Sequence, residues 1–116
     1  MTEKKGILIT FSIKSQKFTP SERTVFFRKL YGWKQVVPTE DKKYEYERPG
    51  ILDEMPHEKV DKSSFIVPED NFDEIMNFFD QWTNKVMLKT FKVLLDRETK
   101  DIFDEFEEQE ELEEDE

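Results

Sequence analysis

The stretch ILITFSIKSQKFTPSERTVFFRKLYG, residues 7–32, contains the two elements from which the rest of the fold is predicted. In residues 7–13 apolar side chains occupy every second position, which predicts a strand with one face in the core. Thr19 and Glu22 have the spacing of a capping box, and Gly32 is a typical residue for a helix end. This stretch therefore predicts a buried strand followed by an amphipathic helix.

Four further segments predict the remaining elements of one α+β domain. They are a strand at 44–48, a strand at 59–67, a helix capped by Asn71, and a strand at 85–96. The order β-α-β-β-α-β favours a ferredoxin-like fold, in which an antiparallel four-stranded sheet carries two helices on one face. Right-handed crossovers place 7–13 and 59–67 in the centre and the polar 44–48 at an edge. The sequence leaves open whether residues 33–58 form one strand or a hairpin.

Charge divides the chain into a nearly neutral body and an acidic tail. Residues 101–116 contain eleven acids and no base, whereas residues 1–100 contain 18 Lys and Arg against 17 acids. We predict a single α+β domain over 1–100 and a mostly disordered acidic tail over 101–116, because consecutive acids repel each other. Three apolar side chains in the tail share one helical face and allow a helical turn there: Ile102, Phe103 and Phe106.

Composition argues against several functional classes. The chain has no cysteine, one histidine and three glycines, so it lacks thiolate metal sites and a glycine-rich phosphate loop and offers little for triad chemistry. It has no 18-residue apolar run that would span a membrane, and we expect a cytoplasmic location. We therefore expect a non-catalytic protein without a cofactor, a metal or a membrane partner, which works by association.

A nucleic-acid interface is the main site hypothesis. Residues 1–50 contain eleven Lys and Arg against six Asp and Glu, and such an excess of cations favours contacts with phosphates. Three basic residues lie away from the predicted apolar stripe of the first helix. Two tyrosines and an arginine share one face of the strand at 44–48, an arrangement suited to the stacking of nucleobases. The candidate residues are Arg23, Arg28, Lys29, Lys34, Tyr44, Tyr46 and Arg48. The alternative is a solvated helix surface with tyrosines that only pack on the sheet.

Two other functions remain open at this stage. The acidic tail suits a protein-interaction or regulatory module that docks on a basic partner. Alternatively, it competes with nucleic acid for the basic face of its own chain, or it only keeps the protein soluble. A metal-dependent hydrolase would use Asp53, Glu54 and His57 or the tail acids, although one histidine supplies only one nitrogen ligand.

The stretch VDKSSFIVPEDNFDEIMNFF, residues 60–79, combines a Lys-Ser-x-Phe strand with an acidic-capped amphipathic helix. In this it resembles the small ferredoxin-like CRISPR-associated subunit of the spacer-integration complex, over roughly residues 7–15 and 59–95. The resemblance implies a homodimer and an association with DNA or RNA. Members typically carry an aspartate at the end of the first strand, where this chain has Ser12 and Ser15 around Lys14. The resemblance therefore implies no nuclease activity.

Overall fold

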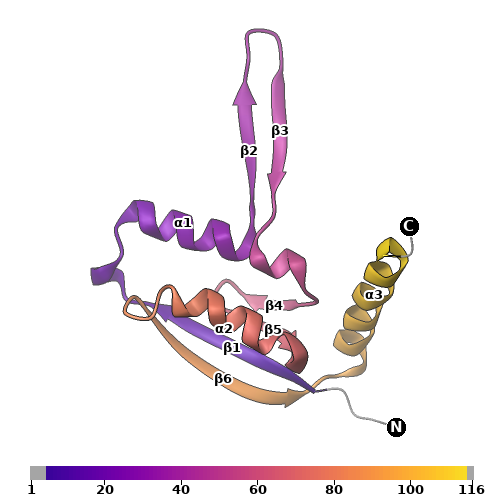
Figure 1. Cartoon of the computed structure of the whole chain (residues 1–116). Helices are drawn as coiled ribbons and strands as arrows, with labels where there is room; N and C mark the ends of the chain where they lie inside the picture. Colours follow the sequence, from indigo (N-terminus) through magenta and orange to yellow (C-terminus); the bar gives the residue numbers. More distant parts are fainter. Residues whose placement is uncertain (1–4, 115–116) are drawn as a thin grey trace.

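A computed structural model describes residues 5–114, and the side chains of all of these except residues 15 and 110–114. The strands and α-helices are β1 (Lys5–Ile13), α1 (Pro20–Tyr31), β2 (Trp33–Pro38), β3 (Lys43–Arg48), β4 (Glu58–Asp61), β5 (Ser64–Pro68), α2 (Phe72–Asp80), β6 (Val86–Leu94) and α3 (Arg97–Glu114). Short 3-10 turns, η1 (Ser15–Lys17), η2 (Ile51–Glu54) and η3 (Glu69–Asn71), lie between them. The chain is an α+β protein, as the sequence predicts (Figure 1).

The main sheet has four antiparallel strands in the order β4-β5-β1-β6. This order is compatible with a ferredoxin-like arrangement. It places β1 and β5 in the centre, as the sequence predicts, because these strands carry the most buried side chains. Ile9 of β1 and Phe65 of β5 are paired and fully buried.

Both α1 and α2 cover the same face of this sheet. Phe11 of β1 lies 5.5 Å from the ring centroid of Phe26 on α1 and 5.6 Å from that of Phe79 on α2. The capping box of α1 is present, since Thr19 Oγ1 accepts the Glu22 N–H at 3.1 Å and Glu22 Oε1 accepts the Thr19 N–H at 3.2 Å. These contacts fix the start of α1 and direct its apolar stripe towards the sheet.

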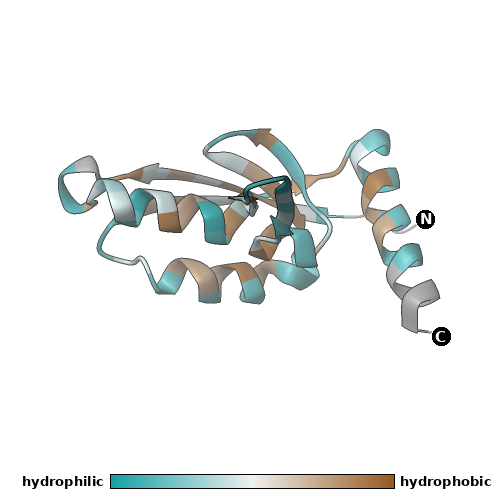
Figure 2. Cartoon of the chain, turned by 90° about the horizontal axis from the view of Figure 1, so that it is seen from above, coloured by the Kyte–Doolittle hydropathy of each residue, from teal (hydrophilic) through white to brown (hydrophobic). Residues whose placement is uncertain are grey.

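The segment 33–58 is where the fold departs most from the prediction. Residues 44–48 do not form an edge of the main sheet, because β3 pairs with β2 in a separate two-stranded sheet. The edges of the main sheet are β4 and β6. This two-stranded sheet, called the ribbon below, projects away from the helices (Figure 1), and Figure 2 looks down on its hydrophilic tip. The ribbon contains too few apolar side chains to be drawn into the core.

Two smaller predictions also need correction. The predicted strand 59–67 is a hairpin, β4–β5, because Asp61 Oδ1 accepts the Ser63 N–H at 2.7 Å and turns the chain there. Asn71 stands at the N-cap of α2, but its side chain makes no capping hydrogen bond. The chain enters α2 directly from η3, so a polar cap is not what starts this helix.

The structure has a helix, α3, where the sequence predicts a mostly disordered tail. Asp96 Oδ1 accepts the Thr99 N–H at 2.8 Å and starts this helix. Phe103 is fully buried, and Ile102 and Phe106 lie near Pro56 and His57. Burial of Phe103 and partial burial of Phe106 favour the helix despite its acidic residues.

Candidate functional site

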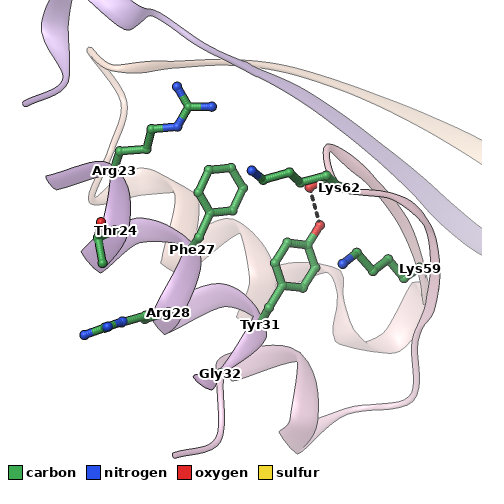
Figure 3. Close-up of a pocket in the computed structure, with 8 residues that line it drawn as sticks. All are labelled: Arg23, Thr24, Phe27, Arg28, Tyr31, Gly32, Lys59 and Lys62. Atoms are coloured by element: carbon green, nitrogen blue, oxygen red, sulfur yellow. Dashed lines mark hydrogen bonds between the residues drawn. The ribbon is translucent and has the colours of Figure 1, made fainter. Parts of the chain in front are cut away.

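A groove lies between the exposed side of α1 and the β4–β5 hairpin (Figure 3). Helix α1 contributes residues one turn apart, Arg23, Phe27 and Tyr31, which therefore share one side of the helix. The hairpin contributes Lys59 and Lys62, which reach from the opposite wall towards the rings of Tyr31 and Phe27. We call these five residues, together with Arg28, the basic groove.

Aromatic rings hold the cations of the basic groove. Lys59 Nζ lies 4.3 Å from the ring centroid of Tyr31, and Lys62 Nζ lies 4.8 Å from that of Phe27. The Arg23 guanidinium, one turn before Phe27 on α1, lies 5.9 Å from the centroid of the Phe27 ring. Among the side chains that the structure describes, none forms an ion pair with these cations or with Arg28. Their positive charge is therefore available to an external anion.

Tyr31 fixes the two walls of the groove to each other. Its hydroxyl donates to the Lys62 carbonyl oxygen at 2.6 Å, and its ring stacks on that of Phe27 at 6.2 Å and 9°. Burial, with a smaller contribution from the charge of Asp61, raises the pKa of Tyr31 to about 12. Tyr31 is therefore neutral at physiological pH and keeps its hydrogen bond to the hairpin.

The ribbon starts where the groove ends. The Arg28 guanidinium points away from Tyr31 (Figure 3) and lies 3.8 Å from the Trp33 ring centroid, at the start of β2. Trp33 is the cross-strand partner of Arg48 on β3. Cations and rings thus continue from α1 onto the ribbon without a break.

Two glycines make this junction tight. Gly32 has φ +83°, a left-handed conformation that favours glycine, and Gly50 packs directly against it. A Cβ on Gly50 would lie 2.3 Å from the Gly32 nitrogen and 2.5 Å from the Leu30 oxygen. Asp53 Oδ2 accepts the Gly50 N–H at 2.8 Å and closes the base. Both strands therefore leave the body at one point.

Strand alternation gives the ribbon two unlike faces. One face carries Trp33, Gln35 and Val37 on β2 with Tyr44, Tyr46 and Arg48 on β3, and we call it the aromatic face. Arg48 Nε donates to Gln35 Oε1 at 2.8 Å, and its guanidinium lies 5.5 Å from the Tyr46 ring centroid. The tyrosines and Arg48 share a face as the sequence predicts, and every residue of β3 is exposed.

The structure places five of the seven predicted site residues in two groups and leaves two lysines apart from them. Arg23 and Arg28 belong to the basic groove, and Tyr44, Tyr46 and Arg48 belong to the aromatic face. Lys34 lies on the opposite face of the ribbon, where its Nζ is 2.8 Å from Glu45 Oε2. Lys29 follows Phe27 by two residues, which places it about 200° around α1 from the ring on the groove floor, and it does not line the groove.

Four residues of the groove and the ribbon base were missing from the sequence prediction: Phe27, Tyr31, Lys59 and Lys62. The first two belong to the apolar side of α1, but they are only half-buried and line the groove. The two lysines flank Asp61 in the sequence KVDKSS, a turn signal that would have placed them beside each other. Nothing in the sequence indicates that this turn faces α1.

The residues proposed for a hydrolase are engaged in local structure. Asp53 closes the ribbon base, and His57 Nδ1 lies 3.1 Å from the Met55 oxygen. Within the described part of the chain, no three His, Asp or Glu side chains converge on a position for a metal ion. Helix α3 with its acids lies on the far side of the molecule from α1 (Figure 1) and does not cover the basic groove of its own chain.

No helix in residues 5–114 is long and apolar enough to cross a membrane. No family model matches the sequence, and neither the curated proteins nor the solved structures contain a match to this chain. The resemblance to the CRISPR-associated subunit therefore stays a prediction.

Proposed function

We propose that the protein binds nucleic acid and acts by association without catalysing a reaction. The observation that supports this is the basic groove, in which four cations lie beside aromatic rings and none is paired with a described carboxylate. Phosphate contacts by Lys and Arg supply most of the affinity in such interfaces. The ferredoxin-like body is the scaffold that holds α1 and the β4–β5 hairpin at the spacing of the groove.

The groove is suited to a chain of phosphates more than to a single small anion. Arg23, Lys59 and Lys62 lie around the groove, and Arg28 points away from them towards Trp33, so the cations do not converge on one point. The rings of Phe27 and Tyr31 hold the charged ends of the lysines, since Lys62 Nζ lies over the first ring and Lys59 Nζ over the second. An extended polyanion would meet successive cations from the groove to the start of the ribbon.

Charge reversal within one helix provides the test. We expect R23E/R28E to bind a labelled 20-nucleotide strand far more weakly than the wild type in fluorescence anisotropy. The matched control is Lys29→Glu, a charge reversal on the same helix at a residue that does not line the groove, which should keep nearly wild-type affinity. About four phosphate contacts correspond to a loss of roughly 50-fold in wild-type affinity between 50 and 200 mM salt.

The competing function has a different outcome in the same experiment. A protein-interaction module whose acidic α3 docks on a basic partner would show no salt-dependent affinity for nucleic acid. Equal affinities for R23E/R28E and K29E would also contradict the proposal, because the position of the charge would then not matter.

Self-association is a second proposed property, favoured by the uncovered face of the main sheet. That face carries apolar residues, of which Met87 and Phe91 are 56% and 51% exposed. By strand register it also carries Lys89 on β6 and Glu58 and Asp61 on β4, so the lysine of one copy can meet an acid of the other. A homodimer with the two faces together would bury these side chains.

Sedimentation of two variants tests the homodimer. Phe91→Glu places a charge on the uncovered face and should leave a monomer. Leu94→Glu, on the same strand but the opposite face, is the matched control and should keep the wild-type mass. A wild type that sediments as a monomer at all concentrations would reject this property and leave the groove proposal intact.

A further inference from the structure

We infer that the nucleic acid is single-stranded and that its unpaired bases stack on the aromatic face of the ribbon. This inference rests on the proposed function, since the basic groove would hold the phosphates of the same strand. The inference adds the aromatic face as a second binding surface, names single-stranded nucleic acid as the ligand, and has the strand leave the groove towards the ribbon.

The aromatic face is exposed in a way that packing does not explain. Tyr44 and Tyr46 are 47% and 46% exposed, and every residue of β3 is exposed. Tyrosines on strands usually cover a neighbouring layer, but the ribbon stands clear of the helices and the main sheet (Figure 1). Two adjacent rings on a bare strand are a platform of the kind on which bases stack.

The opposite face of the ribbon shows which side meets the ligand. It carries Lys34 and Lys43 against Glu45 and Glu47, so its charges cancel. Lys34 is bound to Glu45, and the hydrogen bond to that carboxylate and its charge raise the pKa of Lys34. The aromatic face has Arg48 and no acid. A polyanion therefore favours the aromatic face.

The aromatic face is continuous with the basic groove. Arg28 of the groove lies over Trp33, Trp33 pairs across the strands with Arg48, and Arg48 lies over Tyr46. Rings and guanidinium groups thus alternate from α1 to the middle of β3. A strand bound along this path would keep its phosphates near cations and its bases near rings.

The spacing of the rings favours an extended single strand over a duplex. Tyr44 and Tyr46 are two residues apart on β3, a distance of about 6.8 Å along a strand. This is twice the spacing of about 3.4 Å per nucleotide in a stacked helix, so the rings match bases that have been pulled apart. A ribbon inserted into the groove of a duplex would also bring Glu45 and Glu47 close to phosphates, which opposes that mode.

A pair of variants isolates stacking from charge and from folding. Y44L/Y46L removes both rings but keeps two large apolar side chains, whereas Y44F/Y46F keeps the rings and loses only the hydroxyls. The probes are a thymidine 20-mer, a uridine 20-mer, a 20-base-pair duplex and an abasic 20-mer that has the sugar-phosphate chain without bases. Circular dichroism and melting of both variants verify that the ribbon still folds.

We expect the wild type and Y44F/Y46F to bind one of the single strands at least ten-fold more tightly than the duplex and the abasic strand. Y44L/Y46L should lose about ten-fold or more on that single strand and nothing on the abasic one. Comparison of thymidine with uridine decides between DNA and RNA as the source.

Three outcomes overturn the inference. They are equal binding of duplex and single strand, equal binding of the abasic strand, and no difference between Y44L/Y46L and Y44F/Y46F. If R23E/R28E still abolishes binding in these cases, the proposed function stands and only the stacking role fails. If the wild type binds no probe at low salt, the proposed function fails as well.

Discussion

The four-stranded sheet and the ribbon are both antiparallel, but different interactions hold them. In the main sheet one face is buried, and Ile9, Phe65 and Val67 have no exposed surface. In the ribbon no side chain is buried, and only Trp33 and Gln35 are half-buried. The main sheet is held by its core, whereas the ribbon depends on backbone pairing and a few cross-strand contacts. Substitutions in the first should therefore affect stability, and substitutions in the second should affect binding.

The largest effect should come from the core under α1. Phe26 is fully buried and its ring contacts Phe11, Phe79 and Trp82 at 5.5, 6.1 and 5.3 Å. Phe26→Ala leaves a cavity and should lower the free energy of unfolding by about 3–5 kcal/mol in urea denaturation. Val25→Ala, at the exposed neighbour, should change it by less than about 0.5 kcal/mol. Similar losses for the two variants would mean that α1 does not pack as described.

The junction of the two regions should be next. Gly50→Ala puts a Cβ against the Gly32 nitrogen and the Leu30 oxygen, and backbone cannot move aside as a side chain can. We expect a loss of about 1–3 kcal/mol in unfolding free energy and a displaced ribbon. Pro49→Ala, at the exposed preceding residue, is the control and should be close to neutral in the same denaturation experiment.

Tyr31 links the basic groove to the body, and its titration gives a third prediction. Its pKa is about 12 in the folded protein against 10.0 as the ordinary value, so the folded state holds this proton more tightly. The resulting stabilisation is complete below pH 10 and disappears as the pH rises from about 10 to 12. Stability of the wild type should fall more steeply over this range than that of Tyr31→Phe.

At neutral pH the same substitution should have a modest effect. Loss of the hydrogen bond to the Lys62 oxygen should cost about 0.5–1.5 kcal/mol of stability and loosen the groove wall that carries Lys59 and Lys62. Parallel pH curves for the wild type and Tyr31→Phe would show that Tyr31 does not sense the buried environment described here.

The smallest effect on stability should come from removal of the ribbon. Deletion of residues 34–47 with a short glycine linker leaves the core untouched, so the melting temperature should change little. The same deletion should abolish the preference for single strands over the abasic strand. A large drop in melting temperature would mean that the ribbon is part of the folding unit and that the core alone does not hold the main sheet.

Much of the candidate site follows from local sequence. Arg23 and Arg28 are exposed on α1 because the apolar stripe determines which side of a helix is buried, and Tyr44, Tyr46 and Arg48 share a face because strands alternate. Lys34 was predicted for the same site, but a cross-strand neighbour, Glu45, neutralises it. Pairing partners of a strand are not contained in its own pattern, so the sequence of β2 does not indicate this ion pair.

The sequence by itself determined the α+β class, the capping box, the central positions of β1 and β5 and the separation of an acidic end from a neutral body. These depend on periodicity and on residues a few positions apart, which act before the chain is folded. Only the tertiary structure decided that the ribbon leaves the main sheet and that Lys59 and Lys62 face α1. Those features depend on Gly32 meeting Gly50 and on Tyr31 meeting Lys62, contacts between residues 18 and 31 positions apart. Such contacts form only when the core has brought the two segments together.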